Sequence, residues 1–195
     1  MGDEALLFSE RLAEPVDLTE QPDRLVALAV DVVNLPAERL DAAGLARFLV
    51  EHGEAEPIEL AAGDVRDLAE VRVELGEVFD VAGGGDTAGA AERINRLLER
   101  ARRPPRLSNH EGSPWHLHVT DDDAPWADWL AAVAGLGLAR ILVDDGVARL
   151  GRCAAPSCQM VFAGGPRNHP RRYCSTTCAN RARVAAFRAR RRPIS

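Results

Sequence analysis

Lysine is absent from this sequence of 195 residues, and cysteine is scarce and confined to one region. All four cysteines lie between residues 153 and 178, so no disulfide framework can hold the rest of the chain together. No apolar run approaches the roughly 20 residues of a membrane-spanning helix, and we therefore expect no membrane partner. The chain opens with the acids Asp3 and Glu4 rather than the basic start of a signal peptide. We expect a cytoplasmic protein whose thiols stay reduced and available for a metal.

Acidic residues are missing from the C-terminal segment, residues 151–195. Of the 24 basic and 30 acidic residues in the chain, ten arginines and no acid fall in this segment. Residues 1–150 therefore carry a formal charge of −16, and the segment carries +10. Four thiolates and one zinc ion would lower that charge to about +8. Such a basic end indicates an anionic partner, although a solubilising tail has the same composition. We attribute the use of arginine alone to codon usage in a GC-rich genome.

The length and the apolar fraction of 46% predict one domain of ordinary size plus a small module. Apolar residues recur mostly at three- and four-residue spacing, which is typical of helices with one buried face. We expect a mainly α protein with a few short strands: a helical N-terminal domain at 1–148 and a zinc finger at 149–195. Residues 25–35 fit either a buried strand or a short helix. Other helices are expected at about 41–52, 65–83, 90–102 and 126–143, with short strands near 107 and 115–119.

Glycines interrupt the expected helices at two places. Gly83, Gly84 and Gly85 suggest either a phosphate-binding loop or a flexible turn. The strand and the Gly-Lys-Ser/Thr pattern of a phosphate loop are missing, which favours a turn between helices. Gly135 and Gly137 lie inside the last helix of the N-terminal domain and are expected to weaken it.

The four cysteines form two close pairs, Cys153 with Cys158 and Cys174 with Cys178, separated by fifteen residues. Two short pairs joined by a loop can place four thiolates at ~2.3 Å around one tetrahedral zinc ion. Two disulfides, or four unrelated buried thiols, are the alternatives. The spacing predicts one structural Zn²⁺ held by all four cysteines. Four protein ligands leave no open position for water, so we expect no enzyme.

A treble-clef-like arrangement is expected around the cysteines. Pro156 and Ser157 should turn the chain tightly between the first pair, so that both sulfurs point inward. Residues 160–162 alternate as a short strand, and residues 172–173 are expected to return as its partner. The second pair of cysteines should lie at the start of a helix, where free N–H groups and the helix dipole stabilise thiolates.

That helix is expected to run from about Ser175 to Arg192, with Val184 and Phe187 packed inward. Its arginines recur at spacings of seven and four residues and so lie along lines of the helix. Arginine suits phosphate contact and can also read guanine in the major groove. Asn180 could contact adenine or hydrogen-bond the loop of the zinc site. The candidate nucleic-acid contacts are Arg172, Asn180, Arg181, Arg183, Arg188, Arg190, Arg191 and Arg192.

Two segments resemble known families. The pattern Arg152-Cys153-Ala-Ala-Pro-Ser-Cys158 followed by Arg172-Tyr173-Cys174-Ser-Thr-Thr-Cys178-Ala179-Asn180-Arg181 resembles the CGNR zinc-finger family. The first 140 or so residues resemble the mostly helical ABATE domain that is usually paired with it, most visibly at residues 29–34. The resemblance implies a bacterial transcription regulator, linked in name to stress response, that binds DNA through the finger.

The chain departs from the family pattern at three places, none of which removes a zinc ligand. Ala179 replaces the glycine of the Cys-Gly-Asn-Arg signature. Alanine costs nothing there if the position is helical, and it is strained if the position needs a positive φ. Tyr173 stands where tryptophan is usual, and Ala163-Gly164 lacks the acid that often follows the phenylalanine.

These observations favour a zinc-dependent regulator that binds double-stranded DNA through the finger and its Arg-rich helix. The N-terminal domain would dimerise or sense a small-molecule effector. We expect a homodimer because a lone finger contacts few base pairs. The alternative is a protein-interaction module, in which the basic finger docks on an acidic partner or on the chain's own acidic N-terminal domain.

Overall fold

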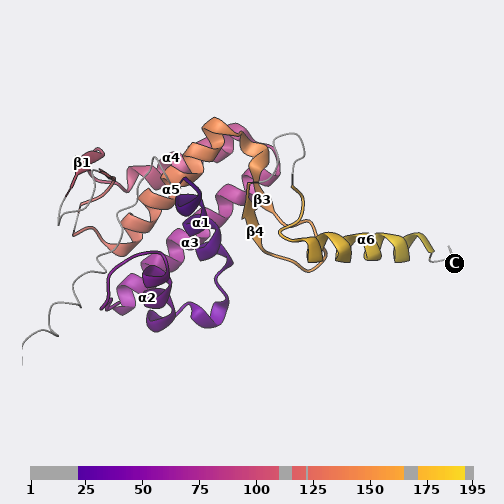
Figure 1. Cartoon of the computed structure of the whole chain (residues 1–195), viewed down its shortest axis with the longest axis horizontal. Helices are drawn as coiled ribbons and strands as arrows, with labels where there is room; N and C mark the ends of the chain where they lie inside the picture. Colours follow the sequence, from indigo (N-terminus) through magenta and orange to yellow (C-terminus); the bar gives the residue numbers. More distant parts are fainter. Residues whose placement is uncertain (1–21, 110–115, 122, 165–170, 192–195) are drawn as a thin grey trace, which may run out of the picture.

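The computed structural model describes residues 22–109, 116–121, 123–164 and 171–191. Helices make up most of these residues, and two small antiparallel hairpins complete them (Figure 1). The expected mainly α fold with short strands is confirmed. In chain order the elements are α1 Pro22–Asn34, η1 Ala37–Arg39, α2 Ala42–Glu51, α3 Ala62–Gly83, α4 Thr87–Glu99, β1 Arg106–Ser108, β2 His116–His118, α5 Trp126–Asp144, η3 Val147–Arg149, β3 Leu150–Arg152, β4 Val161–Ala163 and α6 Thr176–Arg191.

The core lies where α1, α3, α4 and α5 pack together, and we call the unit formed by residues 22–149 the body. Residues 25–34 of the segment 25–35, which fitted either a strand or a helix, are helical, because their apolar residues then share one face toward α5. Val32 of α1, Phe79 of α3 and Leu130 of α5 are completely buried in this core. Arg72 of α3 closes the C-terminal end of α1 by donating to the carbonyls of Val32, Val33 and Leu35 at 2.9–3.2 Å.

Aspartate side chains cap the N-terminal ends of two helices. The Asp41 side chain accepts a hydrogen bond from the Gly44 N–H at 2.7 Å and begins α2. Asp86 accepts from the Gly89 N–H at 2.9 Å, so α4 begins at Thr87, three residues earlier than expected. Between α3 and α4, Gly85 adopts a φ of +79°. The triple glycine is therefore a turn between two helices, as predicted.

The glycines of α5 are positions of close helix contact, which the sequence reading missed. A Cβ atom on Gly137 would lie 2.7 Å from the backbone carbonyl carbon of Leu25 in α1. A Cβ atom on Gly135 would lie 3.2 Å from the Cβ of Leu97 in α4. These two residues thus allow α5 to approach both neighbours, and this packing offsets their low helix propensity.

By length and composition α5 alone, among the described residues, is apolar enough to cross a membrane, with a mean hydropathy of 1.5. The sequence reading had found no such run, because Asp128 and Arg140 interrupt the apolar residues. Half of the most apolar window is buried inside the protein, where α5 packs against α1, α3 and α4. It is a core helix.

The hairpin next to the cysteines differs from the predicted one. β4 pairs with β3, which precedes the first cysteine, and residues 172–173 form no strand. The register pairs Gly151 with Phe162, so the loop between Cys153 and Cys158 forms the turn of the hairpin. Leu150 and Val161 are almost completely buried in the core of the body. Burial of these two apolar side chains stabilises the pairing of β4 with β3 rather than with residues 172–173.

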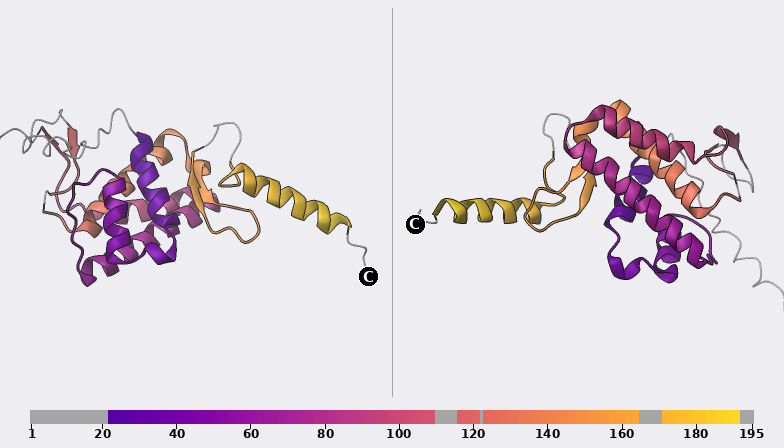
Figure 2. Two further views of the ribbon diagram at one scale, coloured as in Figure 1. Left: turned by 60° about the horizontal axis from the view of Figure 1, so that its bottom comes forward. Right: turned by 180° about the vertical axis from the view of Figure 1, so that it is seen from behind.

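Beyond this hairpin, α6 extends away from the body in every view (Figures 1 and 2). Its residues after Cys178 are exposed or only partly buried wherever their side chains are described. The helix is rich in alanine and arginine, whose high intrinsic helix propensity favours helix formation along this exposed length.

Candidate metal centre and basic helix

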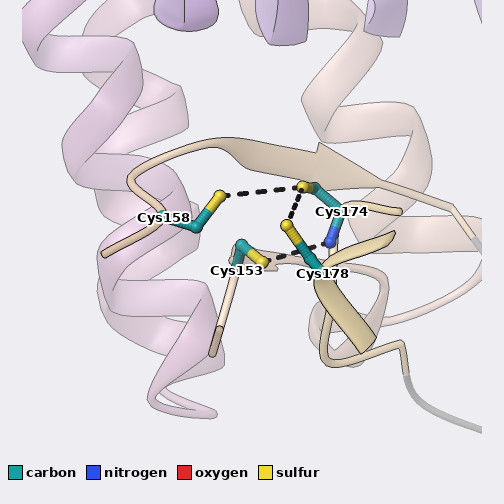
Figure 3. A group of neighbouring side chains, drawn as sticks. All are labelled: Cys153, Cys158, Cys174 and Cys178. Atoms are coloured by element: carbon teal, nitrogen blue, oxygen red, sulfur yellow. Dashed lines mark hydrogen bonds between the residues drawn. The ribbon is translucent and has the colours of Figure 1, made fainter. Parts of the chain in front are cut away.

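Four sulfur atoms converge at the base of α6 (Figure 3). All lie within 4.8 Å of one another. The Cys174 Sγ lies 3.8 Å from the Cys158 Sγ and 3.6 Å from the Cys178 Sγ. Thiolates at ~2.3 Å from a tetrahedral zinc ion are separated by about 3.8 Å, so the sulfur atoms fit that ion. The cysteines are free thiols in this structure, and all four sulfurs share one site, which favours a metal over the two disulfides considered as an alternative.

The first pair of cysteines is held by a tight turn. The Cys158 N–H donates to the Ala155 carbonyl at 3.1 Å, and Ser157 has a φ of 63°. Proline followed by a positive φ is typical of a type II turn, so Pro156 and Ser157 act as predicted. The Cys153 N–H donates to the Met160 carbonyl at 2.9 Å and joins this turn to the strands. The turn therefore directs both sulfurs toward the same point.

The second pair is placed by the N-terminal end of α6. Cys174 precedes the helix, and the Ser175 hydroxyl accepts a hydrogen bond from the Cys178 N–H at 3.2 Å. Ser175 is thus the residue that caps the helix. Ala179 lies within α6, and its N–H donates to the Ser175 carbonyl at 3.1 Å. The position is helical, so alanine replaces the signature glycine without strain.

Arg171 stabilises the segment that contains Cys174 through hydrogen bonds to its backbone. Its guanidinium donates to the Tyr173 carbonyl at 2.7 Å and to the Cys174 carbonyl. It also lies over the Phe162 ring, 5.2 Å from the centroid. The Ala154 N–H donates to the Arg172 carbonyl at 2.8 Å and ties the two cysteine loops together. In the sequence Arg171 counts only as positive charge, and its position three residues before Cys174 was the one signal of this role.

The pKa values of Cys153 and Cys174 differ widely when no metal is bound. Burial opposes ionisation of Cys153, but the N–H groups of Cys174 and Ala155 and the neighbouring thiols lower its pKa to about 7. Burial and the neighbouring sulfurs raise the pKa of Cys174 to about 12. A divalent cation would offset part of the negative charge of four thiolates, and zinc binding would displace the remaining thiol protons. The cluster can therefore hold one structural Zn²⁺.

Among the described residues, Asn34 and Arg152 make polar contacts that join the metal centre to the body. The Asn34 side chain of α1 donates to the Val161 carbonyl at 3.0 Å and accepts from the Val161 N–H at 2.8 Å. Arg152 of β3 contacts Asp80 of α3 through two nitrogens, at 2.5 and 3.1 Å. Arg152 is therefore paired with an acid of the body, and its charge contributes less to the basic surface than the sequence suggested.

Most of the predicted nucleic-acid contacts lie together on α6. The side chains of Asn180, Arg181, Arg183, Arg188 and Arg190 are exposed, and Asn180 Oδ1 accepts from Arg183 Nη1 at 3.4 Å. Arg172 is also exposed but lies before the helix, with its guanidinium 5.9 Å from the Tyr173 ring centroid. The side chain of Arg191, and all of Arg192, lie outside the described residues.

One prediction about α6 is wrong. Val184 and Phe187, which were expected to pack inward, are 48% and 50% exposed. The prediction assumed that the helix folds back on the finger, whereas it leads away from the molecule beyond Cys178 (Figure 2). Only the first turn of α6 contributes to the small core around the cysteines.

Comparison with known families identifies both parts of the chain. Residues 9–155 match the ABATE family, described as "Putative stress-induced transcription regulator". Residues 149–191 match the CGNR zinc finger. A comparison with curated proteins gave no match. The first match covers well over half of the chain and describes a regulator, not an enzyme. The chain belongs to the ABATE family of transcription regulators, and its ABATE domain is followed by a CGNR zinc finger with a four-cysteine cluster for one zinc ion.

Proposed function

We propose that this protein is a zinc-dependent regulator that binds double-stranded DNA through α6. The observation that carries the proposal is the position of this helix: it stands away from the body on a base that zinc would make rigid (Figure 1). Within the residues that the structure describes, none of the ion pairs joins an α6 arginine to an acid. These cations are therefore available to phosphates, and a segment without acids adds no repulsion.

Selection of bound duplexes from random DNA, with the zinc-loaded full chain, tests the proposal. If the five exposed arginines 172, 181, 183, 188 and 190 all contact phosphates, the log–log salt slope should be about −4.5. The double variant Arg181→Ala/Arg188→Ala should make the slope shallower by about 1.8. The matched control is Arg66→Ala/Arg96→Ala, which removes two exposed arginines of the body. Failure to bind any duplex at ~50 mM salt would overturn the proposal.

The alternative of a protein-interaction module makes a different prediction. Docking of the finger on the chain's own acidic body would place α6 against the body, whereas in this structure the helix extends away from it (Figure 2). An acidic protein partner would require the same arginines but would show no preference among DNA sequences. The selection experiment separates the two functions, because only a protein that recognises DNA sequence will enrich a common motif among the bound duplexes.

The body supplies dimerisation in this proposal. A single α6 reaches few base pairs, so two copies would be needed to recognise a site of useful length. Two half-sites spaced by about one helical turn of DNA should then appear in the selected sequences. Sedimentation of the free protein and of its DNA complex measures the number of copies directly. A one-to-one complex on a single half-site would contradict the dimer.

We further propose that a small-molecule effector binds a cavity of about 690 Å³ between the body and the metal centre. Val30 of α1 and Ile141 of α5 line one side, and the cavity reaches Cys174 and Ser175 at the base of α6. A ligand in this cavity would contact the body and the metal centre at the same time. Arg149 lines it, has its Nη2 3.6 Å from Asp145, and keeps a buried Nε without an acceptor in the described structure, a donor that a small carboxylic acid would satisfy. A panel of such acids should raise the unfolding temperature, and Ala27→Phe, which fills the cavity, should abolish the effect.

A further inference from the structure

Two large apolar side chains are exposed on a helix whose other long side chains are cationic. Val184 and Phe187 are about half exposed, three residues apart, and therefore neighbours on one face of α6. Each of these side chains leaves apolar surface in contact with water, and covering that surface would lower the free energy. The helix leads away from the body (Figures 1 and 2), so the body leaves the exposed half of these two side chains accessible. A molecule that binds α6 would gain from covering it.

The arginines lie on both sides of this apolar row. At about 100° per residue, Arg181 and Arg188 fall about 70–90° to one side of its centre, and Arg183 and Arg190 fall as far to the other side. Ala182, Ala185 and Ala186 lie on the opposite face, about 130–170° from this centre, and Asn180 shares the face within about 10° of it. Val184 and Phe187 thus lie between two cationic flanks, one turn after a polar amide, and we call this pair the apolar row.

This arrangement matches the cross-section of a DNA major groove. An α-helix with its side chains is about 10–12 Å wide, and the groove is about 12 Å wide with a phosphate backbone along each side. Cations on both flanks can reach both backbones, which leaves the apolar row facing the base edges. The apolar group that base pairs present there is the C5 methyl of thymine, which side chains such as phenylalanine contact.

A second copy of the chain is a less suitable partner for the same face. Pairing two α6 helices through their apolar rows would bring the arginine flanks of both within about 10 Å, the range of unscreened repulsion. Residues 151–195 contain no acid that could offset this repulsion. Charge complementarity therefore favours a polyanion over self-association.

We propose that α6 lies in the major groove of duplex DNA and that Val184 and Phe187 read thymine methyl groups. This inference rests on the proposed function, because it assigns the base-contacting residues of the same helix. Arginines supply most of the affinity through phosphates, and the apolar row supplies part of the sequence preference.

The test uses the zinc-loaded full chain and the duplex obtained by selection from random DNA. A second duplex replaces thymine by uracil at the enriched positions, which removes only the methyl groups. We expect binding to weaken about fourfold per contacted methyl group, the value for one buried methyl-sized group. Phe187→Ala should weaken binding to the thymine duplex and should lose the difference between the two duplexes. Val184→Ala should do so to a smaller extent.

Two controls separate this effect from others. Val143→Ala removes an apolar side chain that is 83% exposed on α5 and should leave binding unchanged. The salt slope of Phe187→Ala should equal that of the wild type, because no phosphate contact is lost. A merely weakened helix would instead lose phosphate contacts and change the slope.

The outcomes distinguish this inference from the proposed function. If the wild type binds no duplex, the proposed function fails and the inference fails with it. If the wild type binds DNA but Phe187→Ala binds equally well, only the inference is overturned. Equal binding of wild type to both duplexes also overturns it and would indicate insertion in the minor groove, where no methyl group lies. A dimer that dissociates on Phe187→Ala would assign the row to a second copy and overturn the inference as well.

Discussion

Asn34 of α1 pairs with both backbone groups of Val161 in β4, and thereby takes the place of a neighbouring strand. The two hydrogen bonds measure 3.0 and 2.8 Å and link residues 127 positions apart. β4 has only β3 as a partner strand among the described residues, and Val161 itself is almost completely buried. Without Asn34, a buried N–H and a buried carbonyl would lose their partners. This amide is a direct mechanical connection between the body and the metal centre.

Asn34→Ala should destabilise the protein by about 1–3 kcal/mol, the cost of leaving buried polar groups unsatisfied. Urea unfolding of the zinc-loaded protein measures the change. Asn180→Ala is the matched control, since it removes an exposed asparagine of α6 and should change the free energy of unfolding by less than about 0.5 kcal/mol. Equal stability of the two variants would show that the Asn34 bonds contribute nothing.

Gly137→Ala should destabilise the protein by about 1–3 kcal/mol, although alanine is the better helix former. The added Cβ would lie 2.7 Å from α1 backbone atoms, so α1 and α5 would have to separate. Gly63→Ala is the control within α3, where an added Cβ meets nothing within 4 Å. That variant should be neutral or slightly more stable. Thermal unfolding of both variants measures the difference, and a stabilised Gly137→Ala would contradict the close helix contact.

Removal of zinc should unfold the finger and leave the body folded. The core around the cysteines consists of a few residues and is too small to be stable without the metal. Cys178→Ser, or a chelator, should therefore abolish bound zinc and reduce the helical circular dichroism signal by part of α6. Elemental analysis and circular dichroism provide the measurements. A purified wild type without zinc, or a serine variant with an equally ordered α6, would refute the assignment of the metal centre.

Zinc affinity should fall as the pH falls. The free Cys153 thiol has a pKa lowered to about 7, and the pKa of Cys174 is raised to about 12. Protons compete with zinc for every thiolate whose pKa lies above the solution pH, so binding near neutral pH releases protons. Affinity should therefore fall with the pH already between about 12 and 7, where the Cys174 thiol is protonated, and fall more steeply below about 7, where Cys153 is protonated as well. Competition with a chromogenic chelator at several pH values measures this, and a flat profile would contradict thiolate ligation.

Arg171 and Arg172 are adjacent arginines with different expected roles. Arg171→Ala should speed zinc loss to a chelator, because its guanidinium holds the carbonyls of Tyr173 and Cys174. Arg172→Ala should leave zinc retention nearly unchanged and weaken DNA binding, since its side chain is exposed. Each variant thus serves as the control for the other. Identical zinc release rates would show that the Arg171 contacts do not stabilise the cysteine loop.

Glu54→Gln should stabilise the protein at neutral pH. Burial raises the pKa of Glu54, so the folded state holds its proton more tightly than the unfolded state does. The folded state is then favoured below the unfolded pKa, and stability is lost as the pH rises through the folded pKa. Glu56→Gln, at an exposed position of the same loop, is the control. The stabilisation should disappear in acid, and its persistence there would indicate another cause.

Local spacing predicted the features that depend on nearby residues. The helix caps Asp41 and Asp86 act between residues three apart, so the sequence is sufficient to locate them. The turn at Pro156 and Ser157 follows in the same way from local backbone preferences. The partner strand of β4 could not be predicted from local spacing, because β3 pairs with β4 where Leu150 is buried against the body. The two arginines 152 and 171 were likewise indistinguishable from the other basic residues, since their partners lie in other segments.

By itself the sequence determined a mainly helical protein with four cysteines spaced for zinc and a cationic C-terminal helix, because residue type and short-range spacing decide these properties. Only the tertiary structure decided which groups are accessible and which are already paired. In this structure Arg152 pairs with Asp80, Asn34 is hydrogen-bonded to Val161, and α6 extends away from the body. The physical reason is that burial and hydrogen bonding between distant segments depend on how the helices pack, and this packing exposes Val184 and Phe187 among the arginines.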